Sequence, residues 1–299
     1  MRKVAIISDD TCDLPAELLE KYQITIIPNK VIFSDKVFTS CGVQGELTLD
    51  EYYRRAEKEL PTTSIPAPGT IHQAFDRALK NADTVIALFI SKHMSPIADS
   101  ARNVIKQFFP DKDIRVFDTK VTSVALALVV LEAAIMAQEG HSVEKINSKV
   151  EEWLEQIHYA GIMSTLENLV RTGRVPKSKK FLADFFKVKP IVKFVEGQVA
   201  VQGKMRADDQ LIVSQMKRFG KNLLENINGE SNYVFIGHTR WPEAAEEIAA
   251  YMKEHNPEGK EIIIQETGAI VANYVGRKTL TIGYLGEYNN DWLLNTKDA

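Results

Sequence analysis

Short apolar runs alternate with amphipathic segments through the first half of the chain. The run at residues 84–90 has one polar position, Thr84, which is typical of a parallel strand buried on both faces. Thr48 and Glu51 form a capping-box sequence, which predicts the start of a helix. Further strands are predicted at 4–7, 24–28, 30–33 and 114–117, and further helices from 14 and at 70–79, 97–108, 121–138 and 143–157. This repeated order predicts a doubly wound parallel sheet.

The second half of the chain has a different pattern. Glu196-Gly197 separates two alternating runs, 188–194 and 199–204, which predicts a β-hairpin with a tight turn. Helices are predicted at 164–172, 208–227 and 242–253, and strands at 233–236, 262–265 and 280–284. We therefore expect an α/β protein with a parallel-sheet first domain at 1–158 and an α+β second domain at 159–299. Residues 28–60 are expected to form a small β-rich insertion, and the polar tail 289–299 is expected to fray.

Composition and charge narrow the class of protein. The chain has 299 residues with 37 basic and 40 acidic side chains, so there is no excess positive charge for binding nucleic acid. No stretch is long and apolar enough for a membrane span or a signal peptide, and a cytoplasmic location is expected. Two cysteines, Cys12 and Cys41, fit a reducing compartment and have no metal-ligand spacing.

Three carboxylates, Asp9, Asp10 and Asp13, follow the first predicted strand. Ligands of open α/β sheets bind outside the carboxyl ends of the strands, so these groups could hold a metal in a phosphotransferase or hydrolase. Alternatively, Asp13 caps the helix that begins at Leu14, and Asp9 or Asp10 accepts hydrogen bonds from amides of the turn. The second interpretation is favoured, and the metal-dependent enzyme is kept as the alternative.

Two loops are rich in hydroxyl groups. Thr63 and Ser64 lie in the proline-rich loop 61–69, and Ser91 and Ser95 follow the apolar strand 84–90. Short hydroxyl side chains in a fixed loop can donate hydrogen bonds to a carboxylate or phosphate. Either loop alone is also consistent with an ordinary turn. Together they favour a binding site at the edge of the sheet.

Basic groups of the second half could pair with the same kind of anion. Arg174 and Arg206 are candidates, because arginine binds carboxylates in bidentate fashion, although a solvated surface arginine is the commoner case. The sequence has no glycine-rich phosphate loop, nucleophile elbow or zinc-protease motif. No catalytic residue, metal ligand or cofactor is therefore assigned.

The order and spacing of these stretches resemble the DegV family of bacterial fatty-acid-binding proteins. The resemblance runs from residue 4 to about 286. The stretches that carry it are 7–15 (ISDDTCDLP), 22–33, 60–69 (LPTTSIPAPG), 91–102, 117–123 and 165–174 (TLENLVRTGR).

The resemblance implies a function and a set of binding residues. Members of this family hold an acyl chain in an apolar tunnel between two domains, and a separate fatty acid kinase acts on the carboxyl group. The matching positions imply that Thr63 and Ser95 bind the carboxylate, with Ser64 and Ser91 close by. Arg174, Arg206 and Tyr274 are the further positions implied for contacts with the head group or a partner.

The chain departs from the family pattern in two binding loops. It has Ser95-Pro-Ile where the family has Ser-Gly-Thr, and Tyr274 falls where the family has a histidine. The resemblance implies a lipid-binding protein without catalytic activity of its own. The two departures concern the geometry of its head-group site and its use by a kinase.

Overall fold

The computed structural model describes residues 2–40, 46–175 and 188–294. Cys41 and residues 295–299 of the tail lie outside the described residues. The part of the tail within them forms a short helix, α12 (Asp291–Leu294), against α9 (Asp209–Asn226), so the prediction of a frayed tail is wrong there. Its Leu293 is buried, which explains why this polar segment is held in place.

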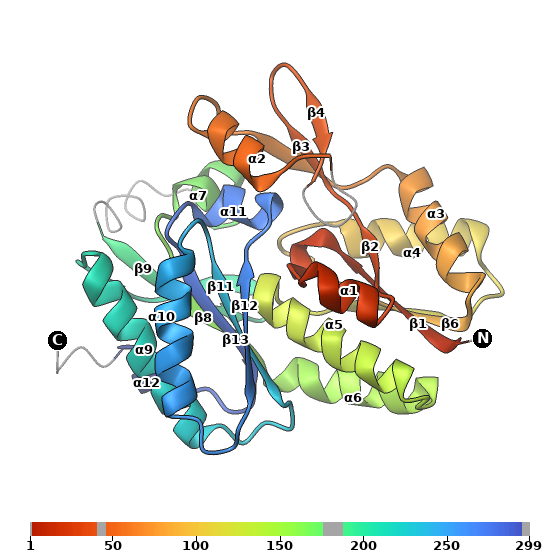
Figure 1. Cartoon of the computed structure of the whole chain (residues 1–299). Helices are drawn as coiled ribbons and strands as arrows, with labels where there is room; N and C mark the ends of the chain where they lie inside the picture. The colour runs from red at the N-terminus through yellow and green to blue at the C-terminus, as the bar shows by residue number, and fades with distance from the viewer. Residues whose placement is uncertain (1, 41–45, 176–187, 295–299) are drawn as a thin grey trace.

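The first half is built on a four-stranded parallel sheet in the order β2-β1-β6-β7. Helix α3 contacts β1, β2 and β6, and α4 contacts β7. The later helix α5 also contacts β1 and β6 (Figure 1). This architecture confirms the predicted α/β class. The strands are β1 (Arg2–Asp9), β2 (Thr25–Ile27), β6 (Ala82–Phe89) and β7 (Ile114–Asp118), and the helices of this half are η1 (Asp10–Cys12), α1 (Ala16–Lys21), α3 (Pro68–Leu79), α4 (Ile97–Phe108), α5 (Ser123–Gln138) and α6 (Val143–Gln156).

The second half forms a six-stranded sheet in the order β10-β9-β8-β13-β11-β12. All its neighbouring strands are antiparallel except β11 and β12. The predicted hairpin is confirmed, with Glu196 and Gly197 at φ of 47° and 80°. The strands are β8 (Ile157–Ile162), β9 (Lys189–Val195), β10 (Gln198–Met205), β11 (Tyr233–His238), β12 (Glu261–Glu266) and β13 (Leu280–Leu285), and the further helices are α7 (Glu167–Thr172), α10 (Pro242–Glu254) and α11 (Ala269–Val275).

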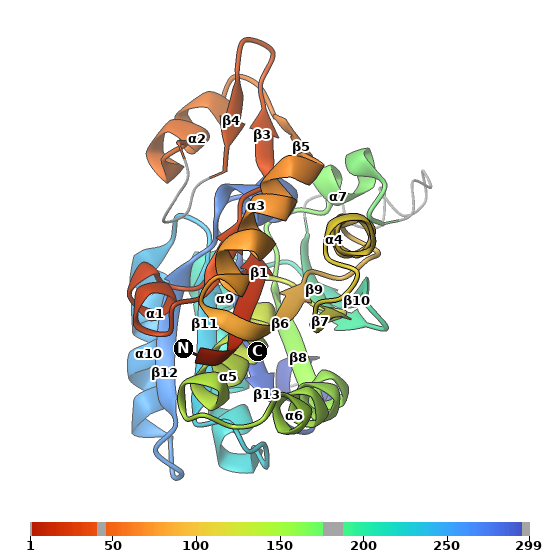
Figure 2. The same ribbon diagram turned by 90° about the vertical axis from the view of Figure 1, so that its right-hand side faces the viewer.

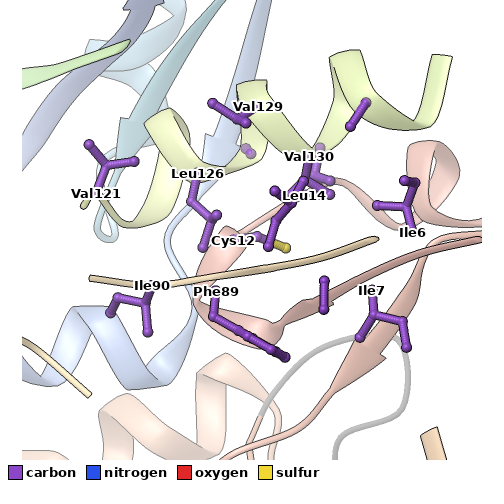
Figure 3. Packing of buried hydrophobic residues seen from close by; sticks show 14 of the residues in the cluster. Ile6, Ile7, Cys12, Leu14, Phe89, Ile90, Val121, Leu126, Val129 and Val130 are labelled. Carbon is purple, nitrogen blue, oxygen red and sulfur yellow. The ribbon is translucent and has the colours of Figure 1, made fainter. Parts of the chain in front are cut away.

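Helix α5 lies between the two large sheets (Figure 1). It is apolar around its whole circumference and almost entirely buried, which is the pattern of a helix enclosed on all sides. Figure 3 shows Leu126, Val129 and Val130 of this helix above the strand that carries Phe89, in one cluster of buried residues with Ile6. On the opposite side, a Cβ on Gly283 of β13 would lie 2.6 Å from the Val124 backbone. The absence of a side chain at this position lets the helix approach the second sheet closely.

A small antiparallel sheet in the order β4-β3-β5 lies above the parallel sheet, beside α2 (Figure 2). It corresponds to the expected β-rich insertion, but its third strand comes from the loop 61–69. Its apolar side chains pack with Ala269, Ile270 and Ala272 of α11. The elements are β3 (Lys30–Ile32), β4 (Val37–Thr39), β5 (Thr62–Ser64) and α2 (Leu49–Ala56).

Local details correct two predictions and confirm a third. Helix α1 begins at Ala16 and Asp13 does not cap it, because Asp13 has left-handed φ and its side chain turns toward other partners. Residue 157, predicted as the end of a helix, begins β8. Thr48 accepts a hydrogen bond from the Glu51 backbone N–H, as the capping-box sequence predicts.

None of the helices within the described ranges has both the length and the apolar character needed to cross a membrane. The proposed division at residues 158 and 159 stays a prediction.

Candidate functional site

A cavity of about 330 Å³ lies at the carboxyl edge of the parallel sheet. Thr11, Asn29, Ile90 and Thr122 each follow the end of one of its strands and contribute to the wall. The rest of the wall comes from the small sheet, the six-stranded sheet and α11. The other lining residues are Thr63, Ser64, Ile65, Met94, Ser95, Pro96, Tyr159, Met163, Leu169, Arg174, Phe194, Val199, Ile270, Val271, Tyr274 and Val275.

Most of the wall is apolar. Tyr159 of β8, Met163 and Val271 are buried, and Phe194 and Val199 come from the two strands of the β9–β10 hairpin. The rings of Tyr159 and Phe194 meet edge to face with centroids 5.3 Å apart. A surface of this kind favours an apolar ligand, since it offers few hydrogen-bonding groups in its interior.

The polar part of the wall is a group of partly exposed side chains. The hydroxyl groups of Thr63 and Tyr274 are 2.5 Å apart and hydrogen-bonded. The guanidinium group of Arg174 lies over the Tyr274 ring at 5.3 Å from its centroid. It donates to the carbonyl of Thr172 at 2.7 Å and to that of Met94 at 3.4 Å. These contacts hold a cation and two hydroxyl groups together at one part of the cavity.

Ser95 is held in place by the backbone of its own loop. The Ser95 N–H donates to the Ser91 carbonyl at 3.0 Å, and the Ser91 N–H donates to the Val121 carbonyl at 3.0 Å. The Asp118 carboxylate accepts a hydrogen bond from the Lys92 N–H at 3.1 Å. The loop is therefore fastened to the end of β7, and Ser95 faces the cavity from a fixed backbone.

The structure brings together five of the seven residues predicted for the site: Thr63, Ser64, Ser95, Arg174 and Tyr274. Ser91 does not line the cavity. It is fully buried, and its hydroxyl group donates to the Gly197 carbonyl at 2.6 Å. This contact fastens the tip of the β9–β10 hairpin to the loop of Ser95.

Arg206 also lies outside the lining of the cavity. It is exposed and directly follows the last residue of β10, Met205. Its expected contact with a head group or a partner stays a prediction.

The carboxylate at the end of β1, Asp9, and the two in the turn after it, Asp10 and Asp13, each accept hydrogen bonds from the protein. Asp9 accepts from the Thr11 hydroxyl at 2.5 Å and from the Ile90 N–H at 3.1 Å. Asp10 accepts from the side chain and the N–H of Asn29. Asp9 also accepts from the backbone N–H of Thr11 at 3.0 Å, which confirms its interpretation as an acceptor in the turn. Burial raises the pKa of Asp9 and, together with the neighbouring Asp9 carboxylate, raises that of Asp10.

Asp13 connects three segments. Its carboxylate accepts from the Ser123 hydroxyl at 2.5 Å and from the Gly268 N–H at 2.9 Å. Burial raises the pKa of Asp13 to about 7. The first turn after β1 is thus joined to the beginnings of α5 and α11. Among the described residues, no three His, Cys, Asp or Glu side chains form a group that could hold a metal ion.

Sequence reasoning missed most of the apolar lining. Ile270, Val271 and Val275 come from α11, which was not predicted at all. The apolar segment 269–275 (AIVANYV) was a signal for a short buried helix. Nothing in the local pattern indicates that this helix faces Tyr159 and Phe194.

The sequence of the chain is similar to those of known proteins along nearly its whole length. The chain matches the family model described as "Uncharacterised protein, DegV family" over residues 3–287. A DegV domain-containing protein of Clostridium perfringens is 29% identical over 290 residues, covering 96% of this chain and all of the relative. One of Streptococcus pneumoniae is 28% identical over 291 residues, covering 94% and 98% of the two chains.

Solved structures share the fold. A Thermus thermophilus protein described as a fatty-acid-binding DegV family protein superimposes with a TM-score of 0.82 at 24% identity, covering 96% of this chain and all of that one. A Eubacterium eligens DegV family protein described as loaded with heptadecanoic acid has a TM-score of 0.79 at 19% identity, with coverage of 95% and 100%.

Proposed function

This chain belongs to the DegV family, and from that premise we propose that it binds one long-chain fatty acid in the cavity described above. The acyl chain occupies the apolar part, and the carboxylate lies among Thr63, Ser95 and the side chains beside them. The cavity acts as a tunnel between the two halves of the chain. In this proposal the protein catalyses no reaction itself.

One observation carries the proposal. A mostly apolar cavity ends at hydroxyl groups and a cation, which is the distribution of polarity along a fatty acid. Thr63, Ser64 and Ser95 can donate to carboxylate oxygens, and Arg174 supplies positive charge beside them. The descriptions of the Thermus thermophilus and Eubacterium eligens neighbours as fatty-acid-binding or fatty-acid-loaded support the same ligand class.

The expected binding free energies are consistent with separate roles for the acyl chain and for the hydroxyl groups. Burying a chain of roughly 16 carbons at about 0.8 kcal/mol per methylene group gives on the order of 11 to 12 kcal/mol before costs. Lost translational and rotational freedom removes several of these. The acyl chain therefore supplies most of the affinity, and the hydroxyl groups supply the orientation.

We further propose that the chain presents the carboxylate to a fatty acid kinase. Thr63, Ser95 and Arg174 are only partly buried, so a carboxylate among them is near the protein surface. The test combines the purified chain, a long-chain fatty acid, ATP and a fatty acid kinase from the same organism. Acyl phosphate that forms only when the chain is present supports presentation. Equal formation without it contradicts presentation.

A titration tests the binding proposal itself. The purified chain is freed of lipid, and hexadecanoic acid is added in a calorimeter. We expect saturation at one acid per chain. A titration without binding, for hexadecanoic acid and for longer and unsaturated acids, would contradict the proposed function.

A further inference from the structure

The small sheet carries part of the proposed head-group site. Thr63 and Ser64 lie on β5, so the orientation of this sheet decides where their hydroxyl groups point. Two contacts tie β5 to α11: the hydrogen bond between Thr63 and Tyr274, and one from the Asn273 amide to the Pro61 carbonyl at 3.2 Å. Both hydrogen bonds lie at one edge of the small sheet, whose apolar side chains also pack on α11.

A third contact lies on the other side of the same sheet, at α2 (Figure 2). The buried Tyr53 ring of α2 lies near two guanidinium groups, that of Arg240 at 4.7 Å and that of Arg277 at 4.9 Å from the ring centroid. Each arginine also pairs with an acidic residue of this segment, Arg240 with Asp50 and Arg277 with Glu57. Cations close to a buried aromatic ring attach α2 to the second half of the chain.

The two arginines lie in loops that are hydrogen-bonded to each other. Arg240 follows β11, and Arg277 follows α11 just beyond Gly276. The Lys278 N–H donates to the Thr239 carbonyl at 2.8 Å, and the buried Thr239 hydroxyl donates to the Gly276 carbonyl at 2.6 Å. Because these bonds join the two loops, the backbones that carry Arg240 and Arg277 are held side by side.

We propose that Tyr53, held by Arg240 and Arg277, is a positioning residue for the carboxylate. It fixes the orientation of the small sheet, and thereby the direction of the Thr63 and Ser64 hydroxyl groups toward the cavity. The inference rests on the proposed function and adds a residue that does not line the cavity. Its consequence is a preference for the free acid over a neutral ester of the same chain length.

The test measures that preference in variants of the full chain. Lipid-free protein is titrated with hexadecanoic acid and with its methyl ester, and the ratio of the two affinities is the readout. In Tyr53→Leu and Arg277→Gln we expect this ratio to fall by about ten-fold, the effect of one hydrogen bond to a charged group. Affinity for the ester should stay close to that of the unmodified chain.

Two further variants act as rescue and control. Tyr53→Phe keeps the ring, and the Tyr53 hydroxyl has no hydrogen-bond partner in the described part of the chain, so the ratio should be retained. Lys278→Gln removes the neighbouring exposed cation, which pairs with Asp209 and lies 5.4 Å from the Trp241 ring centroid. Those partners are in the second half, so this variant should also retain the ratio.

The possible results distinguish a failure of the positioning role of Tyr53 from a failure of the proposed fatty acid binding. An unchanged ratio in both Tyr53→Leu and Arg277→Gln overturns the positioning role. Equal losses for acid and ester in both variants also overturn it, because they indicate general damage to the cavity. If the unmodified chain binds neither compound, the proposed function fails before the positioning role is reached.

Discussion

Thr63 is the residue at which the small sheet, α11 and the cavity meet. Replacing Thr63 with valine and Ser95 with alanine removes two hydroxyl donors with little change in volume. Affinity for hexadecanoic acid should fall by about 1 to 3 kcal/mol in total, because both groups donate to a charged acceptor. Calorimetric titration measures the change.

A matched control lies one residue away on β5. Thr62 is exposed and does not line the cavity, so Thr62→Val should leave the affinity unchanged. Equal affinity in the Thr63 and Ser95 double variant and the unmodified chain would place the carboxylate elsewhere.

Asp13 makes stability depend on pH. Its pKa is raised to about 7 by burial, so between about pH 4 and 7 the unfolded chain loses a proton that the folded chain keeps. The contribution of Asp13 to the free energy of unfolding therefore falls as pH rises through this window, by up to about 1.4 kcal/mol per pH unit. The contribution is fully present below about pH 4 and lost above pH 7.

Asp13→Asn tests this dependence. The amide cannot titrate, yet its oxygen can still accept the Gly268 N–H, and asparagine tolerates left-handed φ. Urea unfolding from pH 4 to 8 should show a flatter profile for the variant. The remaining slope comes from other buried groups. Asp9, Asp10 and Glu132 have raised pKa values and act in the same direction as Asp13, whereas burial lowers the pKa of His158 and His238 to about 4 and makes them act in the opposite direction. An identical slope in the two proteins would contradict the assignment.

Local sequence predicted some side-chain positions and not others. The two hydroxyl-rich loops were identified because short hydroxyl groups in stiff loops are visible in the sequence, and the family resemblance singled out Thr63 and Ser95, which both line the cavity. Ser91 has the same local features, but its hydroxyl group meets Gly197, 106 residues away. Which of two hydroxyl groups faces a cavity depends on such distant contacts, so the local pattern cannot separate them.

At the scale of elements, the close packing of α5 against β13 depends on Gly283. An added Cβ would lie 2.6 Å from both the carbonyl carbon and the oxygen of Val124, and backbone cannot move aside as a flexible side chain can. Gly283→Ala should therefore lower the free energy of unfolding by about 1 to 3 kcal/mol, the usual range for overpacking. Chemical denaturation measures this loss.

Gly69→Ala is the control for Gly283→Ala. This glycine lies in the first turn of α3, and no atom is within 4 Å of the added methyl group. Stability should be equal or slightly higher, because alanine favours the helix. Equal losses in both variants would mean that contact with α5 is not the cause.

The long elements could be predicted because their patterns are strong. Helix α4 has the predicted bounds, and α5 was identified by a long apolar run. Strand β5 was not predicted, since TTS between prolines has no alternating pattern and becomes a strand only by pairing with β3. Helix α11 has seven residues, too few for a clear helical period. Both of these elements belong to the wall of the cavity, as does β8, which was not predicted either.

The whole molecule is organised around α5 and the cavity beside its first turn. The sequence predicted an α/β fold with a parallel sheet, and the structure confirms it. The cavity could not be predicted in the same way, because its wall joins residues from Thr11 to Val275. Its position follows from how the two large sheets pack on opposite sides of one apolar helix.

Native mass spectrometry of the chain as purified from its host tests the central claim most directly. The account predicts a main species heavier than the bare chain by one long-chain fatty acid, and organic extraction should release that acid. A spectrum showing only the bare chain, both before and after incubation with an excess of long-chain fatty acids, would contradict it.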